Sequence, residues 1–118
     1  RTFIMAFILK YKKSFRAKHA LLSYKGKKEE LHEHLYTLIV SINADERNDE
    51  GYTIDFMAIK KFIDELIPDE GEDLNERFPF PTSTENIAEY FFESIKEVFD
   101  VKEIELWQDD NFCVIYRK

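Results

Sequence analysis

The run from Leu31 to Val40, LHEHLYTLIV, is the feature that most restricts how this chain can fold. Its β-branched and aromatic residues favour an extended strand. Because the side chains of residues i and i+2 lie on the same face of a strand, His32 and His34 are expected to project side by side. From Leu35 onward the run is apolar on both faces, so this strand is expected to be covered on both sides.

All three histidines of the chain fall in segments that are predicted to be extended. The third is His19, which lies in the segment Ser14–Ala20. Three neutral imidazoles are a typical ligand set for zinc, and they leave a fourth position open for water or a substrate. An H-x-H pair alone is a weak metal signal, but this pattern uses every histidine present. We therefore predict that His19, His32 and His34 bind zinc.

Length, charge and cysteine content limit the class of protein. A chain of 118 residues has the size of one domain, and 44% hydrophobic residues can supply its core. A net charge of −7 argues against nucleic-acid binding, which needs a basic surface. The single cysteine, Cys113, excludes an internal disulfide and is typical of the reducing cytoplasm. The apolar run Phe3–Leu9 is too short to cross a membrane, so we expect a cytoplasmic protein without membrane contact.

Two pairs of strands are expected, one toward each end of the chain. Alternating and β-branched residues predict strands from Phe3 to about Leu22, from about Leu31 to Ala44, from Val101 to Trp107 and from Asn111 to Tyr116. The polar segments between the members of each pair, Ser23–Glu30 and Gln108–Asp110, are typical of turns. Each pair is therefore expected to form an antiparallel hairpin.

Two amphipathic helices are expected between the hairpins. Apolar residues that recur every three and four positions predict the first from Phe56 to Ile67, with Asp55 as its N-cap. The sequence T-S-T-E that begins at Thr82 is typical of a capping box, with Thr82 as N-cap of a helix from Ser83 to about Phe99. The segment between the helices, Asp69–Pro81, is expected to be a connector.

The order β-β-α-α-β-β predicts one α+β domain over residues 1–118, with a four-stranded antiparallel sheet and two helices on one face. The helices leave the second face of the sheet open, although the first two strands carry apolar residues on both faces. Further copies of the same chain are the simplest cover, with sheets joined edge to edge around an axis. We therefore predict a ring-shaped homo-oligomer.

Five short segments occur in an order that carries a family resemblance. They are Phe15–His19, Leu31–Tyr36, Gly51–Phe56, Asp73–Glu76 and Pro81–Ala88. In this order they resemble the patterns F-x-A-x-H, H-G-H-x-Y, G-x-x-x-D-F, L-N and P-T-x-E-N-I-A of the 6-pyruvoyl-tetrahydropterin synthase / 6-carboxytetrahydropterin synthase family. Glu33 stands in place of the usual glycine. The resemblance extends over residues 3 to 116.

The resemblance implies the tunnelling fold (T-fold) and a zinc-dependent carbon–oxygen lyase of pterin or queuosine-precursor biosynthesis. Its substrate would be a reduced pterin of the dihydroneopterin triphosphate class, bound between neighbouring subunits of a ring, such as a trimer or a hexamer of stacked trimers. It implies the same three zinc ligands. The pterin-anchoring glutamate of the family corresponds to Gln108, which follows Trp107, an aromatic residue able to stack on a ligand.

The chain departs from the family pattern at positions that carry catalysis. The proton-abstracting cysteine of the family lies before the H-x-H pair, where this chain has Glu29 and Glu30. Some relatives use a glutamate instead, so either residue is a candidate base; the alternative is that both are solvated turn residues. The family's Asp–His pair reads Glu70–Gly71 here, which leaves Glu70 at the aspartate position.

Two further hypotheses belong to other functional classes. The missing cysteine and histidine, together with Gln108, favour a catalytically degenerate paralogue that keeps the fold and acts as a binding or assembly module. The retention of all three metal histidines argues against it. A small α+β interaction domain with coincidental histidines is the third hypothesis, and the five ordered motifs argue against that one.

Overall fold

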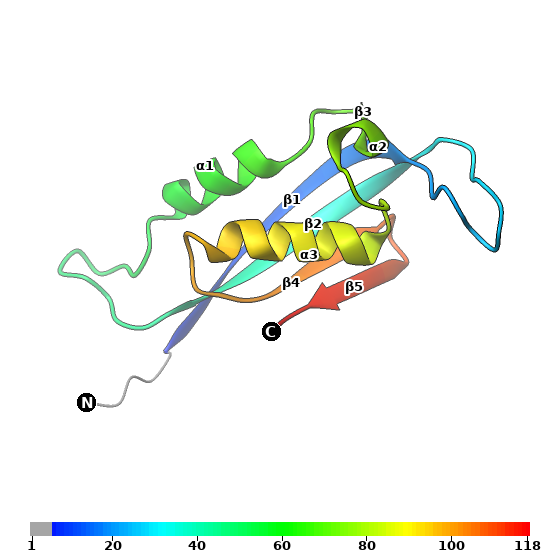
Figure 1. Ribbon diagram of the computed structural model, residues 1–118. Helices are drawn as coiled ribbons and strands as arrows, with labels where there is room; N and C mark the ends of the chain where they lie inside the picture. Colours follow the sequence, from blue (N-terminus) through cyan, green and yellow to red (C-terminus); the bar gives the residue numbers. More distant parts are fainter. Residues whose placement is uncertain (1–5) are drawn as a thin grey trace.

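The computed structural model describes residues 6–118, so the expected strand residues Phe3 to Met5 lie outside it. Its helices lie on one face of a single sheet (Figure 1). The strands are β1 (Phe7–His19), β2 (His32–Ala44), β3 (Glu72–Asp73), β4 (Val101–Gln108) and β5 (Phe112–Tyr116), and the helices are α1 (Phe56–Leu66), α2 (Leu74–Arg77) and α3 (Thr84–Lys96). No helix within residues 6–118 is long and apolar enough to span a membrane.

The sheet has five strands in the order β3-β1-β2-β4-β5 and is mixed, because β3 runs parallel to β1. The prediction of an α+β fold is confirmed, whereas the prediction of a four-stranded antiparallel sheet with two helices is wrong. The difference arises in the expected connector Asp69–Pro81, which contains β3 and α2. A two-residue strand and a four-residue helix are too short to show a hydrophobic period.

The face of the sheet beneath the helices carries the core. The register pairs Phe15 with Tyr36, and Tyr36 with Gln108, so these side chains share that face. Its fully buried apolar members include Tyr36, Leu38, Val40, Ile42, Ile104 and Leu106 of the sheet and Ile63, Phe91 and Ile95 of the helices. The opposite face of β1 is exposed and basic beyond Ile8, since Lys10, Lys12, Arg16 and Lys18 project from it.

The N-cap of α1 was predicted correctly, and the N-cap of α3 was not. Asp55 caps α1 as predicted, because its side chain accepts a hydrogen bond from Met57 N. The N-cap of α3 is Ser83 rather than Thr82: Ser83 Oγ accepts from Asn86 N at 3.1 Å. Thr82 is fully buried instead, and its hydroxyl donates to Asn75 Oδ1 at 3.0 Å. Two adjacent hydroxyl residues offer the same capping signal, and tertiary contacts decide between them.

A polar cluster joins α1 to β1. The Tyr11 hydroxyl donates to Asp64 Oδ1 at 2.6 Å, Lys60 also donates to this carboxylate, and Lys13 Nζ lies 3.9 Å away. Burial by itself would raise the pKa of Asp64, but the hydrogen bonds from Lys60 and Tyr11 and the charge of Lys13 lower it below its usual value. The ionised carboxylate therefore favours the folded state.

This cluster predicts a pH-dependent loss of stability in Asp64→Asn. At neutral pH the free energy of unfolding should fall by roughly 0.5–1 kcal/mol. Because the folded pKa lies below the unfolded one, the contribution is present above about pH 4 and disappears as the pH falls through the folded value. Urea unfolding at pH 7 and at about pH 3 should show a smaller difference from wild type at the lower pH.

The matched control is Glu65→Gln, which removes an exposed charge from the next position of the same helix. It should leave the unfolding free energy unchanged at both pH values. An equal loss in Asp64→Asn at both pH values would contradict an electrostatic origin.

Candidate metal centre

Three imidazoles meet at the end of the β1–β2 hairpin. The register pairs His19 directly with His32, and His34 follows on the same face of β2. Their ring centroids are separated by 4.6, 4.8 and 5.2 Å, and one ring nitrogen of each lies within 4.8 Å of the others. Nitrogens that share a tetrahedral zinc are roughly 3.3 Å apart, so modest side-chain rotation brings these three to one ion.

Each of the three imidazoles contacts an oxygen through its Nδ1 atom at 2.8 Å. The partners are the Thr82 carbonyl for His19, the Glu30 carbonyl for His32 and Asp109 Oδ2 for His34. Because carbonyl and carboxylate oxygens only accept, each Nδ1 carries the proton and donates. In a neutral ring the Nε2 lone pair is then free. Metal-binding histidines usually have such partners on the other nitrogen.

The buried member of the group, His19, has a ring nitrogen without a partner. Its side chain is 4% exposed, and its Nε2 has no hydrogen-bond partner within residues 6–118. Burial lowers the pKa of His19 and outweighs the bond to the Thr82 carbonyl, which raises it, so the ring is neutral. A buried acceptor without a partner is costly, and a cation between the three Nε2 atoms would satisfy it. The donor set therefore fits zinc.

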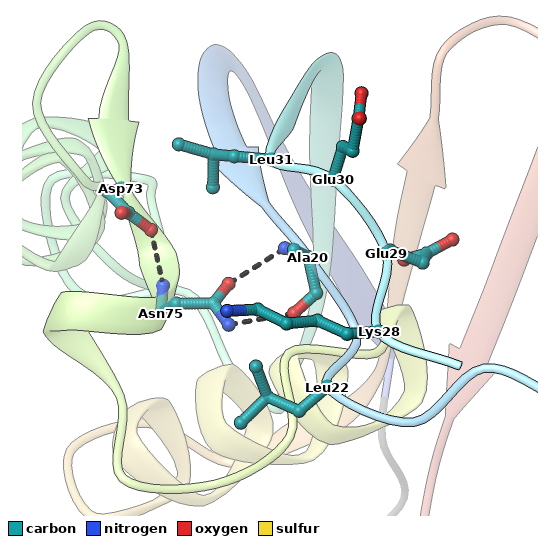
Figure 2. A pocket seen from close by; sticks show the side chains of 8 residues that line it. All are labelled: Ala20, Leu22, Lys28, Glu29, Glu30, Leu31, Asp73 and Asn75. Carbon is teal, nitrogen blue, oxygen red and sulfur yellow. Dashed lines mark hydrogen bonds between the residues drawn. The ribbon is translucent and has the colours of Figure 1, made fainter. Parts of the chain in front are cut away.

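Asn75 of α2 holds the end of β1 against the segment that contains Thr82. Its side chain accepts from Ala20 N at 2.8 Å and donates to Ala20 O at 2.7 Å (Figure 2). The same Oδ1 accepts from the Thr82 hydroxyl at 3.0 Å. These bonds bring the Thr82 carbonyl to His19 Nδ1, so α2, which the sequence did not predict, positions a candidate metal ligand.

The two candidate bases lie in the loop that precedes β2. Glu29 is half-buried, and its Oε1 accepts from Leu21 N at 2.9 Å. It is close enough to His19 for its charge to oppose the lowering of that pKa. Glu30 is exposed, and its carbonyl is the partner of His32. Both residues line a cavity of about 530 Å³, into which Lys28 extends toward Asn75 while the two carboxylates point away from it (Figure 2).

The other predicted site residues are divided between the two faces of the sheet. Gln108 lies on the histidine face, where its Oε1 accepts from the Thr84 hydroxyl at 3.1 Å. Trp107 lies on the opposite face, as alternation along β4 requires. Glu70 has a side chain that is 72% exposed and lies 3.8 Å from Arg16, whose side chain projects from that opposite face. One chain therefore brings Gln108, but neither Trp107 nor Glu70, to the histidine face.

Sequence analysis did not identify Asp109 as a site residue. It stands in the turn between β4 and β5 with a φ of +54°, a left-handed conformation that Asp adopts more readily than most residues. Burial raises its pKa, but the hydrogen bond from His34 and the one from Leu35 N outweigh burial and lower it. The Asp109-Asp110 pair signals a turn, but nothing local shows that the turn reaches a histidine 75 positions earlier.

The fold and the centre together define a class of protein: an α+β domain with a single sheet, whose longest hairpin ends in three convergent imidazoles. Comparison with known proteins agrees with this class. A family model described as 6-pyruvoyl tetrahydropterin synthase matches residues 8–118. The chain belongs to the 6-pyruvoyl tetrahydropterin synthase family, which confirms the resemblance carried by the five motifs.

Individual relatives show how near the chain stands to characterised proteins. It is 33% identical to the dihydroneopterin monophosphate aldolase of Pyrococcus furiosus over 109 residues, which cover 88% of this chain and 91% of the relative. It is 28% identical to the 6-carboxy-5,6,7,8-tetrahydropterin synthase of Bacillus subtilis over 79 residues, which cover 62% of this chain and 53% of the relative. The 6-pyruvoyl tetrahydropterin synthase structure of Caenorhabditis elegans matches with a TM-score of 0.82 at 20% identity, over 95% of both chains, which confirms the T-fold.

The geometry predicts one zinc ion per chain, lost in His32→Ala. His32 is half-buried and is the first residue of β2. Its replacement should therefore abolish stoichiometric zinc binding and have little effect on folding. Elemental analysis after gel filtration measures the zinc, and circular dichroism checks the fold. Glu33→Ala is the matched control, since Glu33 is exposed on the opposite face of β2. Full zinc content in His32→Ala would place the ion elsewhere.

Proposed function

We propose that this chain is a zinc-dependent enzyme that acts on the phosphorylated side chain of a reduced pterin. The observation that carries the proposal is the convergence of three imidazoles, each of which contacts an oxygen through Nδ1 and has Nε2 left for a metal. Such a three-histidine set leaves a coordination position open and is typical of catalytic rather than structural zinc. Family membership and the 33% identical aldolase support a pterin as the substrate.

Zinc bound by His19, His32 and His34 would supply Lewis-acid polarisation of the substrate's side-chain oxygens. The remaining work is proton transfer by the chain's own groups. Glu29 is the proposed base, because it is half-buried, its charge acts on His19, and one of its oxygens is fixed by Leu21 N. Its second oxygen is then available to take a proton. Glu30 is the alternative base, tied to the centre through its carbonyl contact with His32.

Two reactions are open to this arrangement. In an elimination, the base removes a proton from a side-chain carbon, a carbon–carbon double bond forms, and the phosphate or triphosphate group leaves with the electron pair of the broken carbon–oxygen bond. In an aldol cleavage, the base removes the proton of a side-chain hydroxyl and a carbonyl forms there as the adjacent carbon–carbon bond breaks. The electron pair of that bond stays on the carbon attached to the pterin ring, which then takes up a proton. Similarity over 91% of an aldolase's length favours the second reaction and a monophosphate substrate. The first, on the triphosphate, is the expected lyase reaction and remains the competing proposal.

Gln108 is the proposed contact to the pterin ring. It lies on the histidine face and offers one acceptor and one donor, although its acceptor already receives the Thr84 hydroxyl. Trp107 and Glu70 stay predictions for a pocket shared between subunits, because neither reaches the histidine face of its own chain. Binding without catalysis is the alternative function. The family's missing cysteine and histidine, together with Gln108 in place of the glutamate, favour it.

The catalytic proposal predicts turnover that depends on Glu29. Zinc-loaded protein should convert dihydroneopterin monophosphate faster than the triphosphate, with products separated by chromatography and detected by fluorescence after oxidation. Glu29→Gln should lower kcat by about 10²–10⁴-fold without loss of zinc, and Glu30→Gln is the matched control. The reverse pattern would assign the base to Glu30. Stoichiometric zinc without conversion of either substrate would favour the degenerate paralogue.

We also propose that the chain assembles into a ring. The sheet face opposite the helices carries the half-buried Ile39 and Trp107 and the 48% exposed Ile115, and no helix within residues 6–118 covers it (Figure 1). Apolar surface of this kind is typical of an interface. Analytical ultracentrifugation should give a trimer or hexamer of the 14.2 kDa chain. A monodisperse monomer at micromolar concentration would contradict the proposal.

A further inference from the structure

The three oxygens that contact the histidine Nδ1 atoms differ in charge. Those at His19 and His32 are main-chain carbonyls, from Thr82 and Glu30. The oxygen at His34 belongs to the carboxylate of Asp109, at 2.8 Å. An Asp side chain is ionised at neutral pH, so within residues 6–118 the centre has one charged partner among these three.

The Asp109 carboxylate is held in place by the turn that contains it. Its Oδ1 accepts from Leu35 N at 3.1 Å, while its own N–H donates to Leu35 O at 2.7 Å. Leu35 is the neighbour of His34 on β2, so the β4–β5 turn is bonded to the strand that carries the metal ligand. Asp109 has a left-handed φ, and both of its carboxylate oxygens contact residues of this strand. Both carboxylate oxygens are therefore engaged, one with the main chain and one with the imidazole.

We infer that Asp109 is a positioning residue that strengthens metal binding at the centre through its negatively charged carboxylate, which accepts the hydrogen bond from His34 Nδ1. This inference rests on the proposed zinc site. A carboxylate that accepts from Nδ1–H fixes the tautomer, limits rotation of the ring and raises the basicity of Nε2 toward a cation. It also places a negative charge near a dication that three neutral ligands leave uncompensated. Loss of such partners typically weakens metal binding 10–100-fold.

Two variants separate the charge of Asp109 from its geometry. Asp109→Asn keeps an acceptor oxygen of the same reach and removes the charge, whereas Asp109→Ala removes both. Asp110→Asn is the matched control, because Asp110 is the next residue of the same turn and is exposed. Zinc affinity at one fixed pH is measured by competition with a chromophoric chelator, and thermal unfolding of the metal-free proteins reports on the fold.

The expected result is a zinc dissociation constant raised about 10-fold or more in both Asp109 variants and unchanged in Asp110→Asn, with similar unfolding of the metal-free Asn variant and wild type. In the cobalt-substituted proteins, the visible absorption bands of the Asn variant should shift, because the donor strength of His34 changes; a merely structural role would not move them.

Wild-type affinity in both Asp109 variants would overturn this inference while leaving the proposed zinc enzyme intact. Wild-type affinity in Asp109→Asn alone would likewise overturn the role of the charge. A wild-type protein that binds no zinc would overturn the proposed function and this inference together.

Discussion

The antiparallel pairing of β1 with β2 is the constraint on which the candidate centre depends. It extends over all 13 residues of each strand and places His19 opposite His32. A slip of one residue would move His19 to the other face of the sheet. The buried face prevents such a slip, because Phe15 stacks on Tyr36 at 5.3 Å and packs edge-on against Phe91 of α3 at 6.1 Å. Core packing thus sets the positions of the three histidines.

The centre continues the core face toward the open end of the hairpin. Along β2, the inward positions pass from buried apolar residues through Tyr36 to the half-buried His34 and His32. Two buried polar atoms without partners within residues 6–118, His19 Nε2 and the Tyr36 hydroxyl, lie along this boundary. Folded proteins seldom leave such atoms unsatisfied without a functional reason. Both atoms lie near the three imidazoles. A cation bound there, together with a substrate, would supply the partners that they lack.

Long periodic segments made most of the fold predictable, and contacts between distant segments made the rest unpredictable. The H-x-H pair predicted that His32 and His34 share one face, because alternation in a strand is a local property. Asp55 and α1 followed from a local cap and a helical period. Asp109 could not be found in this way, since its role depends on a turn that folds back onto β2.

The short elements β3 and α2 were missed for a related reason. Asp73 both pairs with β1 and caps α2, so one residue ends one element and begins the next within a stretch too short for any period. Thr82, in the segment after α2, is buried; its hydroxyl donates to Asn75 and its carbonyl accepts from His19. That burial explains why Ser83 caps α3 in its place. The sequence pattern of a helix cap is local, but tertiary packing determines which of two neighbouring hydroxyl residues forms the cap.

The central claim is that three imidazoles bind one zinc ion through Nε2, with a position left open. X-ray absorption at the zinc edge of the purified, zinc-loaded protein tests it most directly. We expect a first shell of three nitrogens at about 2.0–2.1 Å with the outer-shell scattering of imidazole rings, plus one further light ligand. A shell without imidazole scattering, or with fewer than three histidines, would contradict the claim.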